Sequence, residues 1–392
     1  MAVFFGLLLF LRILVVSVLC DPTSPVQQPL LAHSGNDTTI STELFEELEE
    51  LARIVDIAYC VGTAGLGIQK PFQCLSRCGE FENFELVKTW NTGPLLSDSC
   101  GYIVLSHPPS PPRIILAFRG TYSIANTIVD LSTVPQAYVP YPGDDKDTTP
   151  SEPKTPGDVP GEPDGEDPPP AHPPKCDNCT VHTGFYSSWL NTRHAILSDV
   201  TEAIEKYPDY RLTLVGHSLG GAVAALAGLD FKARGWDPRV TTFGEPRIGN
   251  KELNAYLNER FNITSDDPDG NKYHRVTHIG DPVPLLPLEE WGYSMHGEEI
   301  YISQPALPPS VADIHYCHGD EDPACIHGSD RDAPAWGVPT RFKFWNLFFA
   351  HRDYFWRIGL CVPSGGLKDW ISSTPEPEGS AAELELLENN EL

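Results

Sequence analysis

The pattern of apolar and polar positions divides much of the chain into helices and short strands. Apolar residues recur at helical spacing after Ser41 or Thr42, either of which suits a helix cap, and they predict a helix with one buried face. Its apolar positions are Leu44, Phe45, Leu48, Leu51, Ala52, Val55 and Ala58. Strands are predicted at 102–106, 113–118, 212–215, 240–243 and 275–279, and further helices at 182–206, 221–229 and 251–261. Strands that alternate with helices indicate an α/β fold, in which helices cover a mostly parallel sheet on both faces.

Three segments depart from this pattern. Residues 139–175 are dominated by Pro, Asp, Glu and Gly, so they bury too little apolar surface to offset the entropy of ordering. We predict that they form a disordered insertion inside a single catalytic domain at 41–362, because closure entropy grows only slowly with loop length. A flexible lead or propeptide is predicted at 21–40, and an acidic C-terminal tail at 363–392.

The N-terminus predicts export from the cell. Residues 1–20 are almost wholly apolar and end near a cysteine, which is typical of a signal peptide. Arg12 lies inside the apolar run instead of before it, and the run approaches the length of a marginal membrane anchor, which is the alternative. No later segment has the length and apolarity of a span, so we expect a secreted, extracellular protein.

Cysteine spacing and sequons agree with export. Cys74/Cys78, Cys176/Cys179 and Cys317/Cys325 are spaced for short disulfide loops in an oxidising compartment. Half of a zinc site at Cys176-x-x-Cys179 is the alternative for that pair, but the chain has no second C-x-x-C motif. The Asn-x-Ser/Thr motifs at Asn36, Asn178 and Asn262 are candidate glycosylation sites.

The charge balance bears on partners. A formal net charge of −27 argues against binding to a polyanion such as nucleic acid and favours a soluble protein. We expect no nucleic acid partner, no stable membrane span and a monomer.

The most informative motif is Gly216-His217-Ser218-Leu219-Gly220, which has the pattern G-x-S-x-G. A predicted strand precedes it and a run of small residues suited to a helix follows, which is the setting of a nucleophile elbow. The elbow presents a serine at the apex of a tight turn, where glycines tolerate the close backbone approach. A tight turn with an unreactive serine is the alternative.

A nucleophilic serine needs a base and an orienting carboxylate, in the chain order Ser, Asp or Glu, His for this type of elbow. Asp281 follows a predicted strand in the rigid sequence Gly280-Asp281-Pro282-Val283-Pro284, where it either orients the base or caps a turn. Among the histidines, His351 opens an aromatic run that would anchor its loop, and His296 is the second candidate.

The other histidines are not expected to act as the base. His274 and His278 share the strand that leads to Asp281, so we expect packing or hydrogen-bonding roles. The spacing of His315, His318 and His327 matches no common zinc pattern.

An oxyanion hole needs two donors. The backbone N–H of Leu219, directly after the serine, is one. Arg119-Gly120-Thr121 after an earlier strand offers the N–H, and the hydroxyl, of Thr121 as the other.

Taken in order along the chain, these segments resemble the fungal class 3 lipases, the family of the Rhizomucor and Thermomyces lipases and of related feruloyl esterases. The segments that carry the resemblance are 116–123, 182–185, 215–221, 243–250, 280–287, 292–296 and 351–361, and together they span roughly 41–362. The resemblance implies the α/β-hydrolase fold, Ser218 as nucleophile, Asp281 as orienting acid and His351 as base. It also implies Thr121 and Leu219 as oxyanion donors.

Disulfides and a lid follow from the same resemblance. It implies the pairs Cys60–Cys361 and Cys176–Cys179, and Cys317–Cys325 resembles a bridge of the feruloyl esterase branch. Cys74–Cys78 would leave Cys100 unpaired, and pairing of Cys100 with Cys74 or Cys78 stays open. A lid helix would lie at 123–131, where Ile124, Ile128 and Leu131 make an apolar face. Thr127 stands where the family often has tryptophan, and a packed surface loop is the alternative.

The sequence favours a secreted triacylglycerol lipase that needs neither metal nor organic cofactor. The alternatives are a feruloyl or other carboxylesterase, or a phospholipase, on the same fold. A non-catalytic protein that binds lipid or wall polymer is disfavoured, because all three triad residues occur in order.

Overall fold

A computed structural model describes most of the predicted domain. The described residues are 39–62, 67–93, 98–121, 135–143, 175–264, 268–297, 299–319, 321–330 and 349–362. The predicted signal peptide, lid and acidic tail lie outside them, as do 21–38 of the predicted lead and 144–174 of the predicted insertion. The last two residues of the lead are described: Thr39 forms a β-bridge with His315, and Ile40 is buried. At the start of that insertion, residues 139–143 are described and contain a turn at 141–143. The Tyr186 hydroxyl donates to the Val139 carbonyl at 3.0 Å and holds this segment against α3.

Helices and strands alternate through the described chain, much as the sequence predicts. The helices are α1 (Thr42–Ile57), α3 (Thr183–Lys206), α4 (Leu219–Ala233) and α5 (Lys251–Phe261). The strands are β1 (Phe84–Asn91), β2 (Cys100–Ser106), β3 (Arg113–Arg119), β4 (Pro135–Ala137), β5 (Thr180–His182), β6 (Arg211–His217), β7 (Arg239–Phe243), β8 (Tyr273–His278), β9 (Glu299–Ile302) and β10 (Ile314–Tyr316). Short 3-10 helices lie at Ala58–Cys60, Arg77–Glu80, Pro268–Gly270, Val283–Leu285, Glu289–Trp291, Val311–Asp313 and Ile326–Asp330.

Within the described residues, the strands form an eight-stranded sheet in the order β1-β2-β3-β6-β7-β8-β9-β10, and β4 pairs with β5 separately. The central run from β3 to β9 is parallel, while β1, β2 and β10 pair antiparallel at the edges. Parallel strands bring their carboxyl ends to one edge of the sheet, where loops from different strands meet. The sequence predicted the parallel centre and not these antiparallel edges.

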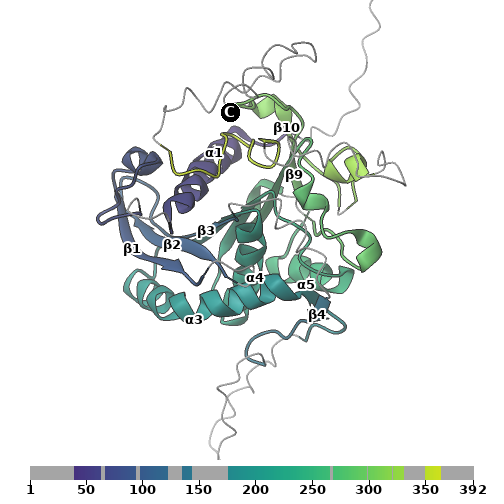
Figure 1. Cartoon of the computed structure of the whole chain (residues 1–392), viewed down its shortest axis with the longest axis horizontal. Coiled ribbons are helices and arrows are strands. Elements are labelled where there is room, and N and C mark those ends of the chain that lie inside the picture. The colour runs from purple at the N-terminus through teal and green to yellow at the C-terminus, as the bar shows by residue number, and fades with distance from the viewer. Residues whose placement is uncertain are drawn as a thin grey trace, which may run out of the picture. The chain divides into compact units, whose positions relative to one another are not determined.

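Helices cover both faces of the sheet, as Figure 1 shows for α1 on one face and for α3 and α4 on the other. Side chains along β3 alternate between the two cores: Ile114, Leu116 and Phe118 pack with α3 and α4, whereas Ile115 and Ala117 pack with α1. Because β3 is buried on both faces, its sequence is an almost continuous apolar run, and this run is what predicted the strand. The α/β-hydrolase fold class predicted from the sequence is confirmed.

The two ends of the described domain are joined covalently. The disulfide Cys60–Cys361 connects the 3-10 turn after α1 to the segment 349–362. The structure also contains Cys74–Cys78, Cys176–Cys179 and Cys317–Cys325, and Cys100 is free and buried on β2. In the described part of the chain, no helix combines the length and apolarity needed to cross a membrane.

Candidate active site

Ser218 lies at the apex of a sharp turn between β6 and α4. Its backbone has φ 57° and ψ −129°, a left-handed conformation that is rare and strained for a residue with a side chain. Its N–H donates to the Phe243 carbonyl at the end of β7, at 2.9 Å. The turn therefore projects the serine side chain at the carboxyl edge of the sheet, directly before the first turn of a helix.

Close backbone packing holds this turn against β3. A Cβ atom added to Gly220 would lie 2.3 Å from the Phe118 carbonyl oxygen, so only glycine fits there. Next along the chain from β3, a Cβ on Gly120 would lie 2.8 Å from the Cβ of Ser218. The end of β3, and with it Thr121, is thus adjacent to the serine. Leu219 is the first residue of α4, where backbone N–H groups have no acceptor within the helix.

Asp281 and His351 form a fully buried pair at the same edge. The His351 Nδ1 atom lies 3.0 Å from both carboxylate oxygens of Asp281. Because a carboxylate only accepts hydrogen bonds, Nδ1 is the donor, so in the neutral ring Nε2 is the nitrogen that can accept a proton. The sequence predicted these two residues separately, 70 positions apart, and the fold brings them into contact.

Two further donors hold the Asp281 carboxylate. The Tyr354 hydroxyl donates to Oδ2 at 2.5 Å and the Val283 N–H to Oδ1 at 2.9 Å. Burial, and next the Asp281 charge, raise the pKa of Tyr354 well above its usual value, so the hydroxyl stays protonated as a donor. Tyr354 belongs to the aromatic run after His351. The sequence indicated that this run anchors its loop, but not that one of its members contacts the acid.

Gly244, in the turn after β7, lies against all three of these side chains. Its φ is +60°, and an added Cβ would lie 2.6 Å from the Tyr354 hydroxyl, 2.9 Å from His351 Cε1 and 3.0 Å from Asp281 Oδ2. The turn therefore needs glycine both for its backbone angle and for space.

Several buried side-chain polar atoms have no hydrogen-bond partner among the described residues, and two of them belong to residues that the sequence assigns to the reaction. They are His351 Nε2 and the Thr121 hydroxyl oxygen. Buried polar atoms in folded proteins are nearly always paired, so an orphan calls for an explanation such as a ligand. His351 Nε2 thus makes no hydrogen bond to the Ser218 hydroxyl in this structure. A nitrogen and a hydroxyl left unpaired in this way are groups that a bound ester and the oxyanion formed from it would engage.

The sequence did not predict a series of buried hydrogen bonds, from Tyr59 through His217, that supports the backbone of His351. The His217 Nε2 atom lies 2.8 Å from the His351 carbonyl oxygen, to which it must donate, and the Tyr59 hydroxyl lies 2.5 Å from His217 Nδ1. Burial, and next the charge of His351, lower the pKa of His217 well below its usual value, so its ring stays neutral. The motif contains His217, but no sequence signal pairs it with Tyr59, which lies 158 positions away.

The Asp56 carboxylate, in the last turn of α1, holds the later part of the segment 349–362 that carries His351. The Gly359 N–H donates to Asp56 at 2.9 Å, and the Arg352 guanidinium donates to the Gly359 carbonyl at 2.8 Å. Asp56 also accepts from Ser76 at 3.2 Å, and Arg77 lies 3.7 Å away. Burial outweighs these favourable contacts and raises the pKa of Asp56 to about 6.

This shift predicts a pH-dependent contribution to stability. Because the folded-state pKa of Asp56 lies above its unfolded value, its contribution is fully present below about pH 4 and is lost as pH rises through about 6. Relative to Asp56→Asn, the wild-type free energy of unfolding should fall by about 2–3 kcal/mol across that range. Urea unfolding at intervals from pH 4 to 7 measures it. The exposed Asp209→Asn is the control, and parallel curves for wild type and Asp56→Asn would contradict the prediction.

The remaining histidines lie outside this constellation. His296, the second candidate base, is buried with its Nε2 3.1 Å from the Glu245 carboxylate, away from Asp281. His278 is buried on β8 and donates to the Gln304 carbonyl at 3.2 Å, which is the hydrogen-bonding role expected of it. His327 lies 3.6 Å from Glu289.

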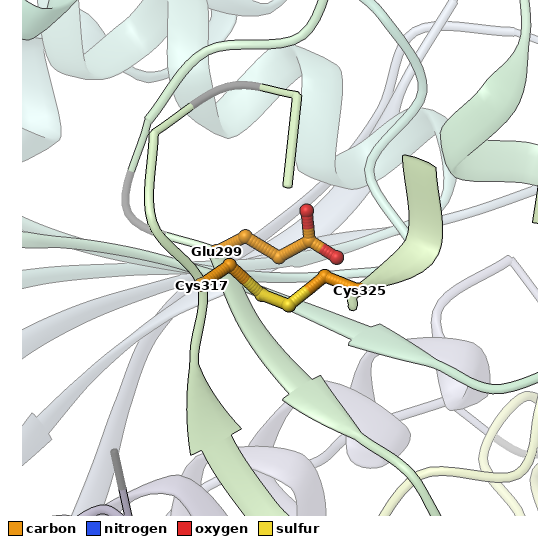
Figure 2. Close-up of side chains that lie close together, drawn as sticks. All are labelled: Glu299, Cys317 and Cys325. Atoms are coloured by element: carbon orange, nitrogen blue, oxygen red, sulfur yellow. A yellow bond between two sulfur atoms is a disulfide. The ribbon is translucent and has the colours of Figure 1, made fainter. Parts of the chain in front are cut away.

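Within the described residues, the one grouping with the spacing of metal ligands is Glu299 with Cys317 and Cys325. Figure 2 shows that the two sulfur atoms are bonded to each other beside the carboxylate. A disulfide sulfur is not a thiolate ligand. The Glu299 oxygens accept from Thr277, Arg275 and the Ile326 N–H, so the grouping is a structural polar cluster.

Both described sequons are accessible. Asn178 and Asn262 are exposed, each with a left-handed backbone, and Asn262 caps the C-terminus of α5. Asn36 and the predicted lid residues Ile124, Ile128 and Leu131 lie outside the described residues.

Comparison with known proteins agrees with this geometry. The family model described as Lipase (class 3) matches residues 115–291. The chain is 48% identical over 392 residues to "Secreted mono- and diacylglycerol lipase 2" of Gibberella zeae, covering 90% of each protein. It is 47% identical to "Lipase A" of Sodiomyces alcalophilus, covering 88% of each. The crystal structure of Lip2 lipase from Yarrowia lipolytica superposes with a TM-score of 0.64 at 29% identity, covering 83% of this chain and 97% of that one.

The identity to the Gibberella protein extends over nine-tenths of both chains, and the fold matches a solved lipase along nearly its whole length. The chain therefore belongs to the class 3 lipase family, and it is a secreted carboxylic ester hydrolase.

Proposed function

We propose that the protein hydrolyses the ester bonds of acylglycerols, triacylglycerols among them, through an acyl-enzyme on Ser218. The observation that carries the proposal is the Asp281–His351 pair, in which Nδ1 faces the carboxylate and Nε2 is buried without a partner among the described residues. A serine hydroxyl is a poor nucleophile unless a base of this kind removes its proton.

The reaction follows from these positions. His351 Nε2 takes the Ser218 hydroxyl proton as the oxygen attacks the ester carbonyl carbon, and the carbonyl oxygen becomes an oxyanion. The N–H of Leu219 and the N–H and hydroxyl of Thr121 donate to that oxyanion. His351 then returns the proton to the departing alcohol, which leaves an acyl group on Ser218. A water, deprotonated by His351, releases the acyl group as a carboxylic acid and restores the serine.

The buried surroundings support each role. Asp281 stabilises the imidazolium that forms on His351, and Tyr354 and Val283 keep the carboxylate in place. The Thr121 hydroxyl is buried without a described partner, so it is preorganised for an oxyanion instead of being engaged elsewhere. Such donors are worth about 3–4 kcal/mol each in related acyl transfers.

The substrate class rests on the relatives and on the lid. The Gibberella relative carries mono- and diacylglycerol lipase in its name. An apolar lid face at Ile124, Ile128 and Leu131 would favour opening on a lipid surface. We also propose cleavage of a signal peptide at 1–20, and glycosylation at Asn36, Asn178 and Asn262.

A substrate panel tests the proposal. The purified protein is assayed on p-nitrophenyl esters from acetate to palmitate, on emulsions of mono-, di- and triacylglycerol, on phosphatidylcholine and on methyl ferulate. We expect hydrolysis of acylglycerols, with rates that rise above the solubility limit of the ester. Activity confined to methyl ferulate or to phosphatidylcholine would contradict the acylglycerol assignment and favour a feruloyl esterase or a phospholipase.

A further inference from the structure

A buried arginine holds the loop that follows the candidate acid. The Arg247 side chain is wholly buried, and its Nη1 donates to the carbonyls of Leu285 and Pro287 at 2.5 and 3.1 Å. Its Nη2 donates to the half-exposed Glu289 carboxylate at 2.9 Å, and its backbone N–H donates to the Leu286 carbonyl at 2.7 Å. One residue thus spans the loop from 285 to 289.

The same loop begins at Asp281 and sets the position of its carboxylate. The Val283 N–H donates to Asp281 Oδ1, and Val283 opens the 3-10 turn that ends at Leu285. On its other side, Leu285 packs in an apolar cluster with Met295, Tyr301, Cys325 and Ile326. The loop is therefore held between this apolar cluster and the guanidinium, and a shift at residue 285 would reach the carboxylate through one turn.

Arg247 stands on an element that also contacts the base. It belongs to the turn after β7, three residues beyond Gly244, which packs against His351 and Asp281. The turn 244–247 consequently links the two parts of the site. Gly244 contacts the Asp281–His351 pair, and Arg247 binds the loop 285–289 that follows Asp281.

The chemistry requires arginine at this position. A planar guanidinium presents several donors in a fixed fork, whereas a lysine ammonium is a flexible point charge. Here the fork meets two backbone carbonyls and one carboxylate. An apolar side chain of similar length would fill the space but leave the carbonyls without their donor.

We infer that Arg247 is a positioning residue for the reaction: it fixes the loop that carries Asp281, and so holds the Asp281–His351 hydrogen bond. This inference rests on the proposed role of Asp281. It predicts a loss of kcat, because a displacement of about 1 Å in a catalytic constellation can lower the rate by up to 10²-fold.

The test compares Arg247→Met, Arg247→Lys and Glu289→Gln in the full chain with a soluble short-chain p-nitrophenyl ester. We expect kcat to fall about 10- to 100-fold for Arg247→Met, with KM within about twofold, and to recover partly for Arg247→Lys. Glu289→Gln should stay within about threefold, because the backbone carbonyl contacts remain. Arg193→Met, which removes a buried arginine of α3 paired with Asp230 of α4, controls for lost stability.

Two readouts separate positioning from folding. The Arg247→Met change should cost almost nothing further in an Asp281→Asn background, because residues that act as one unit are non-additive. The proton resonance of the His351 Nδ1–H, which donates to Asp281, should shift or broaden in Arg247→Met and stay unchanged in Arg193→Met.

The outcomes distinguish this inference from the proposed function. If Arg247→Met keeps wild-type kcat, or if its loss simply adds to that of Asp281→Asn, Arg247 acts on stability alone and the inference is overturned. If instead Asp281→Asn is itself fully active, the proposed triad fails, and the inference fails with it.

Discussion

Replacing Ser218 with alanine should lower ester hydrolysis by about 10⁵- to 10⁶-fold while leaving the fold intact. The substitution removes only the hydroxyl group. The strained turn should persist, because it is held by the hydrogen bond from the Ser218 N–H to the Phe243 carbonyl and by the close approach of Gly220 to β3. The acyl-enzyme cannot form without that oxygen, whatever the state of the base. What remains is catalysis by the oxyanion donors and by substrate binding alone.

The measurement is kcat on a p-nitrophenyl ester, with circular dichroism to verify folding. Ser188→Ala is the matched control, since Ser188 is a fully buried serine of α3 whose hydroxyl has no partner within the described residues. That variant should keep wild-type activity. The double variant Ser218→Ala/His351→Ala should be no slower than Ser218→Ala, because the two act as a unit. Substantial turnover by Ser218→Ala would place the nucleophile elsewhere.

The second large effect is expected for Asp281→Asn, which should lower kcat by about 10⁴-fold. The amide is isosteric and can still accept the Val283 N–H. It can also present an N–H group to His351 Nδ1, which would then become the acceptor. The proton would move to Nε2, and the imidazole could no longer accept the Ser218 proton. The loss comes from the wrong tautomer and not from a displaced backbone.

Two variants bracket this prediction. Tyr354→Phe removes one donor to the carboxylate and keeps the tautomer, so kcat should fall only by about 10-fold. Asp230→Asn alters an equally buried carboxylate, paired with Arg193 and Arg234, and should lower stability but not kcat. Wild-type turnover by Asp281→Asn would mean that a different carboxylate orients the base.

Much of the fold was predictable because its central strands are buried on both faces. β3 and β6 are short, largely apolar runs, whereas β7 and β8 mix β-branched and aromatic residues with polar ones and are buried along most of their length. Each of the four was predicted to within a few residues. β2 was predicted too, whereas β1, β9 and β10 were missed for local reasons. The pairing of β1 with β2 shifts register between Leu86 and Lys88, which breaks the simple alternation of a half-buried strand. β9 and β10 are only a few residues long and carry polar residues such as Glu299, which is paired inside the core.

The sequence by itself determined the candidate chemistry: a serine in a strand-turn-helix motif, and a carboxylate and a histidine in the order that such a motif requires. These signals are local, because each depends on a few neighbouring residues and their backbone preferences. Only the tertiary structure decided how the three are held. The contacts of Tyr354 with Asp281, of Tyr59 with His217 and of Arg247 with the acid loop join segments 38 to 158 positions apart. Their geometry arises when parallel strands end at a common edge, so no local pattern in the sequence encodes it.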